Sequence, residues 1–269
     1  MNPTVSIVMA TYGHEATIEQ AIRSIAAQKF DEPIELLVGE DCGPDQSRAL
    51  ILNLRQELGN WIVPCFPESN LGGTRNLENL MNTAKGEFIA FCEGDDFWIS
   101  PHKLARQVEA MRRNPSASIC FTQAIPYRAG TWPQPEPVAM PEIASVQQLL
   151  RGNFMHSCSV MYRRQAEFSL PKWFSEIAIG DWPMHVLQAL HGPILFLREP
   201  MAVYRIHAGG SWSQRSWQYR KNEVIRMLGY LRNELPNQLH PALDETVARL
   251  QQAKDETDRF SGLYAEIAA

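Results

Sequence analysis

The segment Phe88-Ile-Ala-Phe-Cys-Glu-Gly-Asp-Asp-Phe-Trp98 joins a run of five apolar residues directly to three acids, Glu93, Asp95 and Asp96. An apolar run of this length is typical of a buried strand. Carboxylates crowded at a strand end repel one another unless a cation lies among them. Hard divalent cations such as Mg²⁺ prefer oxygen ligands and commonly bridge to phosphates. The segment therefore predicts a metal-dependent site for a phosphate-bearing substrate, with a plain polar turn as the alternative.

The first 125 residues alternate strand-like apolar runs with stretches of helical spacing. Strands are expected at 5–10, 34–38, 61–66, 88–92 and 118–121, and helices at 15–28, 50–58, 77–84 and 104–111. This alternation predicts an α/β fold with a mostly parallel sheet covered by helices on both faces. Ligands of such sheets bind at the carboxyl ends of the strands, where the three acids fall.

The rest of the chain is less regular. Five prolines between Pro126 and Pro141 predict a loop, because proline lacks an N–H and restricts the residue before it. Strands are expected at 159–162 and 194–197, and a helix at 182–190. Two more helices are expected from about Ser213, and the last carries the apolar residues Leu243, Val247, Leu250, Phe260, Leu263 and Ile267.

Charge and composition exclude several classes of protein. The 269 residues include 25 basic and 30 acidic side chains, a formal charge of −5, so we expect no nucleic-acid partner. The sequence has no apolar run of about 18 residues, and its first residues lack a charged and then apolar leader, so neither a spanning helix nor a signal peptide is expected. Five cysteines spread singly predict reduced thiols in a cytoplasmic protein.

Four segments at expected strand ends or loops form an ordered series: Thr11-Tyr12, Glu40-Asp41-Cys-Gly-Pro-Asp45, Asn70-Leu-Gly-Gly-Thr-Arg-Asn76 and Glu93-Gly-Asp-Asp96. The series resembles the family 2 glycosyltransferases of the GT-A fold, whose usual pattern is T-Y-N, D-D-G-S-x-D, N-x-G-x-x-x-A-R-N and D-x-D-D. Gly180-Asp-Trp182 falls where that family keeps an acid before a helix. Tyr204-Arg-Ile-His-Ala-Gly-Gly-Ser-Trp212 looks like its Y-R-x-H-x-x-G segment. The sequence departs from the family pattern at Gly13, Glu40 and Glu93.

The resemblance implies a Rossmann-like GT-A domain over residues 1–212, with a nucleotide-binding part at 1–125 and an acceptor-side part at 126–212. A helical extension at 213–269 would follow. The implied ligands are a nucleotide-diphosphate sugar, Mg²⁺ or Mn²⁺, and a glycan, lipid-linked or protein acceptor. Enzymes of this family in bacteria build cell-surface polysaccharides, so the implied place is the cytoplasm or the inner face of the membrane.

The resemblance also implies roles for single residues. The donor would be held by Thr11, Tyr12, Glu40, Asp41, Asn70, Gly72, Arg75, Glu93 and Asp95. Structural alternatives stay open: strand-end packing for Thr11 and Tyr12, a helix N-cap region for Glu40 and Asp41, and a solvated side chain for Arg75. A cation at the start of a helix does not complement the helix dipole, which favours a nucleotide contact for Arg75.

Metal and proton transfer are assigned in the same way. Asp95, Asp96 and His207 would organise the metal and the diphosphate, and Asp181 would take the proton of the acceptor hydroxyl in an inverting transfer. The alternatives are an N-cap role for Asp181 and a purely structural histidine at 207. The segment 215–232 is a basic amphipathic helix that either lies on anionic membrane or packs on the domain with its basic face solvated. The last helix either packs within the chain or forms a dimer.

These patterns together predict a metal-dependent, inverting glycosyltransferase. Two other functions remain alternatives. One is a metal-dependent nucleotidyltransferase, although the glycine-rich phosphate loop common in such enzymes does not follow Thr11-Tyr12. The other is a non-catalytic module that binds a sugar nucleotide or a partner, which the glutamates at 40 and 93 would favour.

Overall fold

A computed structural model describes residues 2–128, 131, 140–166, 169–207, 209–210, 212 and 215–254. Within these residues nine strands form one sheet of order β3-β2-β1-β4-β8-β6-β9-β5, with β7 paired to β9. The strands are β1 Val5–Thr11, β2 Ile34–Glu40, β3 Ile62–Pro64, β4 Phe88–Phe91, β5 Phe97–Trp98, β6 Ile119–Arg128, β7 Ile143–Ala144, β8 Val160–Arg163 and β9 Ile194–Ile206. The helices are α1 Ile18–Ala26, α2 Ser47–Leu58, α3 Gly73–Thr83, α4 Lys103–Arg113, α5 Val146–Arg151, α6 Asp181–Ala189, α7 Trp217–Leu231 and α8 His240–Gln252.

The sheet has a parallel half and a mixed half. Strands β3, β2, β1 and β4 pair in parallel, and so do β6 and β9. The antiparallel strand β8 joins the two halves between β4 and β6. Most paired residues are in parallel ladders, which confirms the predicted α/β fold.

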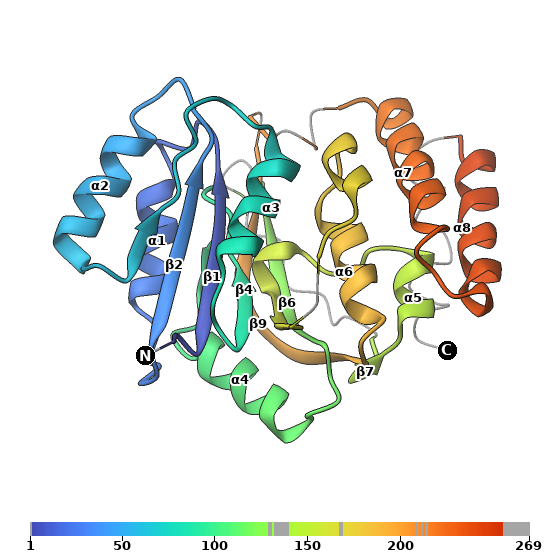
Figure 1. Cartoon of the computed structure of the whole chain (residues 1–269), viewed down its shortest axis with the longest axis horizontal. Helices are drawn as coiled ribbons and strands as arrows, with labels where there is room; N and C mark the ends of the chain where they lie inside the picture. Colours follow the sequence, from blue (N-terminus) through green and yellow to red (C-terminus); the bar gives the residue numbers. More distant parts are fainter. Residues whose placement is uncertain are drawn as a thin grey trace.

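Alternating strand residues divide the core between the two faces of the sheet. Val5, Ile7 and Met9 of β1 pack with residues of α1, α2 and α4. Val8, which points the other way, packs in a cluster with residues of α3 and of α5 to α8. In Figure 1, α1 and α2 lie at one end of the molecule, and α7 and α8 lie side by side at the other end. The α/β prediction is thus met on both faces.

Helices α7 and α8 belong to the same core as the sheet. Helix α7 buries Val224, Met227, Leu228 and Leu231 in the cluster that contains α6. Among its basic side chains, Lys221 donates to the Ala253 carbonyl at 3.2 Å and Arg232 pairs with Asp244. The segment at 215–232 therefore packs on the domain. None of the described helices combines the length and the apolar character that crossing a bilayer requires.

Three sequence predictions need correction or fall outside the description. The predicted loop does not begin at Pro126, because β6 continues to Arg128 beside β9. Strand β8 pairs with β6 only at Ile119–Phe121. Beyond Phe121 this edge of β6 has no strand partner among the described residues, so it tolerates Pro126, which lacks an N–H. Strand β9 likewise extends well past Leu197 to Ile206, across a register irregularity opposite Thr122 and Gln123. Pro133, Pro135, Pro137, Phe260, Leu263 and Ile267 lie outside the described residues.

A buried asparagine fixes helix α3 to strand β2. Asn76 is 3% exposed, and its Nδ2 donates to the Gly39 carbonyl at 2.7 Å. A Cβ on Gly39 would lie 2.4 Å from Asn76 Oδ1, so only glycine leaves room for this close approach. Helix α3 is thereby held against the end of β2, directly before Glu40 and Asp41.

We expect Asn76→Ala to lower the free energy of unfolding by about 1–3 kcal/mol, because the Gly39 carbonyl loses its partner in a buried place. Urea unfolding measures the change. Asn79→Ala on the same helix is the matched control, since Asn79 is exposed. Equal stability of the two variants would show that the hydrogen bond does not hold α3 in place.

Candidate functional site

Three side chains from distant parts of the chain meet at one edge of the sheet. Asp95 follows β4, His14 follows β1, and His207 follows β9. His207 Nε2 lies 2.9 Å from Asp95 Oδ2, and His14 Nε2 lies 3.8 Å from the same oxygen. One ligand atom from each residue lies within 4.8 Å of the other two. The structure thus brings together Asp95 and His207, two of the three predicted metal ligands.

The protonation of this cluster follows from its contacts. The Gly209 N–H donates to His207 Nδ1 at 3.2 Å, so His207 Nε2 carries the ring proton that it donates to Asp95. The hydrogen bond to Asp95 raises the pKa of His207. Burial acts to raise the pKa of Asp95, but the hydrogen bond from His207 contributes to bringing it below its usual value. Asp95 is therefore an ionised, half-buried acceptor.

Asp96, the third predicted ligand, lines the same cavity as Asp95 but has one oxygen engaged by the backbone. It is 2% exposed, and its Oδ1 accepts the backbone N–H of Arg205 at 2.8 Å. The Arg205 guanidinium donates to the Asp95 carbonyl and to Gln20, and it lies 4.6 Å above the Phe97 ring. Asp96 is absent from the three-residue cluster found among the described residues. Its carboxylate attaches the end of β9 to the turn after β4.

Glu93 has an unusual environment. Burial, followed by the charge of Asp95, raises its pKa to about 7. Its Oε2 is buried without a hydrogen-bond partner in the described part of the chain. A buried unpaired oxygen is costly, and such atoms concentrate where a ligand supplies the missing partner. Glu93 lines a cavity together with Asp95 and Asp96.

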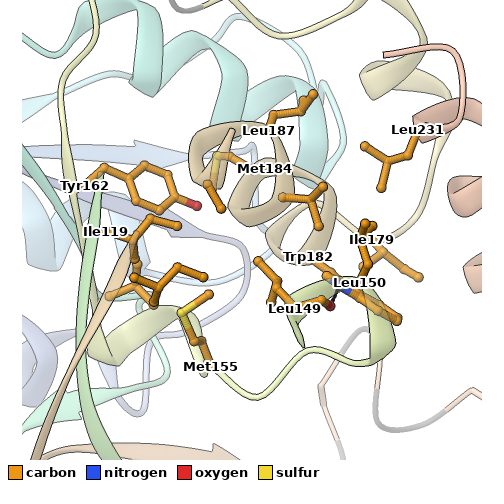
Figure 2. Packing of buried hydrophobic residues seen from close by; sticks show 14 of the residues in the cluster. Ile119, Leu149, Leu150, Met155, Tyr162, Ile179, Trp182, Met184, Leu187 and Leu231 are labelled. Carbon is orange, nitrogen blue, oxygen red and sulfur yellow. Dashed lines mark hydrogen bonds between the residues drawn. The ribbon is translucent and has the colours of Figure 1, made fainter. Parts of the chain in front are cut away.

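That cavity, of about 320 Å³, also reaches Asp181. Asp181 is the first residue of α6, and its Oδ2 accepts from Asn153 Nδ2 at 2.9 Å. The next residue, Trp182, is buried, and its Nε1 donates to the Leu149 carbonyl at 2.9 Å (Figure 2). The buried indole anchors the first turn of α6 and with it the Asp181 carboxylate. Asn153 was not identified from the sequence, because nothing in its local pattern marks it.

The two acids after β2 are occupied by contacts within the chain. Glu40 is 1% exposed and accepts from the Gly43 N–H at 2.6 Å and from Arg48 Nε at 2.5 Å. Asp41 accepts the N–H of Leu71 at 2.7 Å and the N–H of Gly72 at 2.8 Å, one on each oxygen. Asp41 therefore fixes the loop before α3.

A second contact closes the loop before α3. The remaining residues predicted to bind the sugar donor lie near this loop or at the end of β1. Asn70 Nδ2 donates to the Asp41 carbonyl at 2.8 Å. Arg75 is exposed in the first turn of α3, without a hydrogen bond or ion pair to the described residues. Tyr12 is 52% exposed, whereas Thr11 is 3% exposed. Arg75 and Tyr12 are thus available to an external ligand, and Asn70 and Asp41 shape the backbone between them.

Two of the three tryptophans near the motifs serve packing. Trp98 is 4% exposed, donates to the Cys158 carbonyl at 2.9 Å and lies under Lys103 Nζ at 4.2 Å. Trp182 anchors α6 as described above. Trp212 is half-buried and lines the cavity. The five cysteines are free thiols, and Cys92, Cys120 and Cys158 are buried, as expected from the sequence.

Comparison with solved structures supports the fold. A crystal structure of residues 1–349 of S. aureus TarS in complex with UDP-GlcNAc aligns with a TM-score of 0.72 and 18% identity, over 97% of this chain and 75% of that one. The mannosyltransferase PcManGT from Pyrobaculum calidifontis, in complex with GDP-Man and Mn²⁺, aligns with a TM-score of 0.68 and 15% identity, over 100% of this chain and 76% of that one. At these identities the likeness establishes the GT-A fold.

Sequence comparison identifies the family. An uncharacterised protein of Mycobacterium tuberculosis, Rv1520, is 34% identical over 220 residues, which are 81% of this chain and 63% of that protein. The putative teichuronic acid biosynthesis glycosyltransferase TuaG of Bacillus subtilis is 24% identical over 81% of this chain and 85% of its own length. The model of the family described as glycosyl transferase family 2 matches residues 6–168. The chain therefore belongs to glycosyl transferase family 2.

Proposed function

We propose that this chain transfers a sugar from a nucleotide-diphosphate sugar to an acceptor hydroxyl, with inversion at the anomeric carbon. One observation carries the proposal: Asp95 and Asp181 line the same cavity. An inverting transfer needs a cation-binding group beside the leaving diphosphate and a base beside the attacking hydroxyl. The negative charge of Asp181 also acts to raise the pKa of Glu93, so these two residues of the cavity interact electrostatically.

The residues after β4 and β9 fit a divalent cation. Asp95 Oδ2 and His207 Nε2 lie 2.9 Å apart and offer a carboxylate oxygen and an imidazole nitrogen. For Nε2 to bind a cation, the ring proton of His207 would move to Nδ1, which would then no longer accept the Gly209 N–H. Both Mg²⁺ and Mn²⁺ commonly bind beside phosphates. Such an ion, when bound, offsets the negative charge that develops on the nucleotide diphosphate as the bond to the sugar breaks. PcManGT, whose structure contains GDP-Man and Mn²⁺, provides the precedent.

Asp181 would act as the base. The acceptor hydroxyl oxygen attacks the anomeric carbon, its proton passes to Asp181, and the diphosphate leaves with the electrons of the broken C–O bond. Asn153 donates to one carboxylate oxygen, which sets the orientation of the other. The hydrogen bond of Trp182 keeps the start of α6 in place. The chain thus supplies the base on a rigid element, which favours a precise approach of the hydroxyl.

The class of acceptor is inferred from a relative, because the fold does not specify it. TuaG is named for teichuronic acid biosynthesis, and we propose a cell-surface glycan or glycoconjugate acceptor for this chain as well. The chain spans 63% of the length of its mycobacterial relatives, so activity and acceptor are proposed for the whole protein from this part. Residues 126–212 contribute Asn153, Asp181 and Trp212 to the cavity and would form the acceptor side.

We expect Asp181→Asn to lower the rate of sugar transfer by roughly 10²–10⁴-fold, the usual contribution of a general base. Binding of the nucleotide should persist, because the amide oxygen can still accept from Asn153 and the fold of α6 is retained. Radiolabelled transfer and calorimetric titration with the nucleotide measure the two effects. Asp31→Asn at an exposed position is the control. Normal turnover in Asp181→Asn would remove the assignment.

We expect Asp41→Asn to loosen the loop before α3 and to weaken nucleotide binding. One end of the new amide is an NH₂ group that faces the N–H of Leu71 or Gly72, where the carboxylate accepted both. Losing one such bond costs about 1–3 kcal/mol. Hydrogen exchange at residues 71 and 72 reports the loop.

Nucleotide binding is measured with the same variant. The shift in melting temperature with UDP, GDP, CDP or dTDP, each with Mn²⁺ or with EDTA, reports the ligand. A metal-dependent shift with one nucleotide in the wild type, reduced in Asp41→Asn but retained in Asp31→Asn, is the expected result. Unchanged exchange at residues 71 and 72 would mean that other contacts hold the loop.

A further inference from the structure

We propose that His14 is a metal ligand and that the site of two imidazoles and one carboxylate selects a transition ion such as Mn²⁺ or Co²⁺ over Mg²⁺. The inference rests on the proposed function, because Asp95 and His207 are the same residues that would hold the donor's cation. Neither the resemblance nor the sequence pattern assigned a role to His14. The structure places its Nε2 3.8 Å from Asp95 Oδ2, on the oxygen that His207 also contacts.

The orientation of the His14 ring leaves Nε2 for a cation. Its Nδ1 lies 3.0 Å from Thr11 Oγ1. With the ring proton on Nδ1 and donated to this hydroxyl, Nε2 carries a lone pair directed toward Asp95. Histidines that bind metals usually donate from their second nitrogen to a fixed oxygen in this way. Thr11, which was predicted to contact the donor, would therefore position His14.

The backbone around His14 is fixed before any ligand arrives. The carbonyl of His14 accepts the N–H of Thr17 at 2.9 Å and that of Ile18 at 2.8 Å, in the first turn of α1. Its own N–H donates to Ser47 Oγ at 3.1 Å. Gly13, at φ +68°, makes the turn that brings His14 back over the end of β1. The backbone that carries the imidazole is therefore held by hydrogen bonds within the chain, which preorganises the side chain for ligand binding.

Gly94 provides the space for this arrangement. A Cβ on Gly94 would lie 2.4 Å from Thr11 Oγ1 and 2.8 Å from His14 Nδ1. The Gly94 N–H donates to the Ala10 carbonyl at 3.2 Å, and its carbonyl accepts from Thr17 Oγ1 at 2.9 Å. Only a residue without a Cβ at position 94 leaves room for the hydrogen-bonded Thr11 and His14 side chains. His14 therefore packs directly against the acidic segment that contains Glu93 and Asp95.

The donor set decides which ion fits. Mg²⁺ prefers oxygen ligands and keeps its waters, whereas imidazole favours first-row transition ions. Asp96 is engaged by the backbone of Arg205, so the cluster offers one carboxylate and two imidazoles rather than two carboxylates. Two histidines and one carboxylate leave open positions for other ligands, which suits an ion that also contacts the donor's diphosphate.

The test measures metal binding directly. Wild type, His14→Ala and the control His102→Ala are titrated with Mn²⁺ by electron paramagnetic resonance, with Co²⁺ by visible absorption, and with Mg²⁺ by competition against Mn²⁺. His102 is exposed before α4, so its loss removes a histidine without touching the cluster. We expect wild type and His102→Ala to bind Mn²⁺ and Co²⁺ at least about tenfold tighter than Mg²⁺. His14→Ala should lose about 10–100-fold in Mn²⁺ and Co²⁺ affinity, by analogy with losses at other metal sites.

A second variant guards against misfolding. Circular dichroism and melting temperature establish that His14→Ala is folded. Thr11→Val keeps the imidazole and removes only its Oγ1 partner, and we expect a smaller loss of Co²⁺ affinity with an altered Co²⁺ spectrum. If His14→Ala is folded, Mn²⁺ and Co²⁺ affinities equal to those of the wild type would overturn the inference. If His14→Ala is unfolded, an unaltered Co²⁺ spectrum and affinity in Thr11→Val would overturn it. So would equal affinity of the wild type for Mg²⁺ and Mn²⁺.

The inference and the proposed function fail in different ways. Selective Mn²⁺ binding that depends on His14, without cleavage of any nucleotide sugar, would support the inference and contradict the proposed transfer. Metal-dependent cleavage of a nucleotide sugar, with metal affinities unchanged in His14→Ala, would support the transfer and contradict the inference.

Discussion

The geometry of the site depends on the hydrogen bond from the Arg205 N–H to the buried Asp96 carboxylate. It connects the turn after β4 to the end of β9, 109 residues further along the chain. The Arg205 guanidinium adds bonds to the Asp95 carbonyl and to Gln20 of α1. His207 lies two residues beyond, and it reaches Asp95 because the strand end is held there. A buried carboxylate with good partners can specify a geometry as well as stabilise it.

Acids in similar motifs have acquired different tasks because their surroundings differ. Glu40 accepts from Arg48, and Asp41 accepts from two backbone N–H groups, so both acids fix the loops around them. Asp95 is ionised between two imidazoles, while Glu93 next to it has a raised pKa and an unpaired oxygen. Placing Asp95 and Glu93 close together favours one ionised and one protonated carboxyl. The more acidic group is the one that a cation would bind.

The sequence predicted the α/β sheet and its flanking helices, because apolar periodicity is a local signal. It also marked Asp95 and His207, which the structure brings together. It failed where contacts are long-range. Strand β9 continues through Arg198-Glu-Pro200, which reads as a polar break, because its pairing with β6 overrides the local pattern. His14 sits in a turn without a marking pattern, and only the close approach of β1 and β4 brings it to Asp95. Sequence spacing also does not show that Asp96 Oδ1 accepts the Arg205 N–H.

The position of Asp181 depends in part on α7 and α8, which the sequence predicted as a helical extension. Asp181 opens α6, and α6 packs in one cluster with Leu149 of α5 and Leu231 of α7 (Figure 2). Helix α8 contacts both α5 and α7, so it closes this cluster from outside. The carboxylate that would take the acceptor's proton is therefore held by residues from 145 to beyond 240, whereas the proposed metal ligands are held by the sheet. Residues of both parts line the cavity, so a shift of the helices relative to the sheet would change the distance across which the proposed transfer would take place.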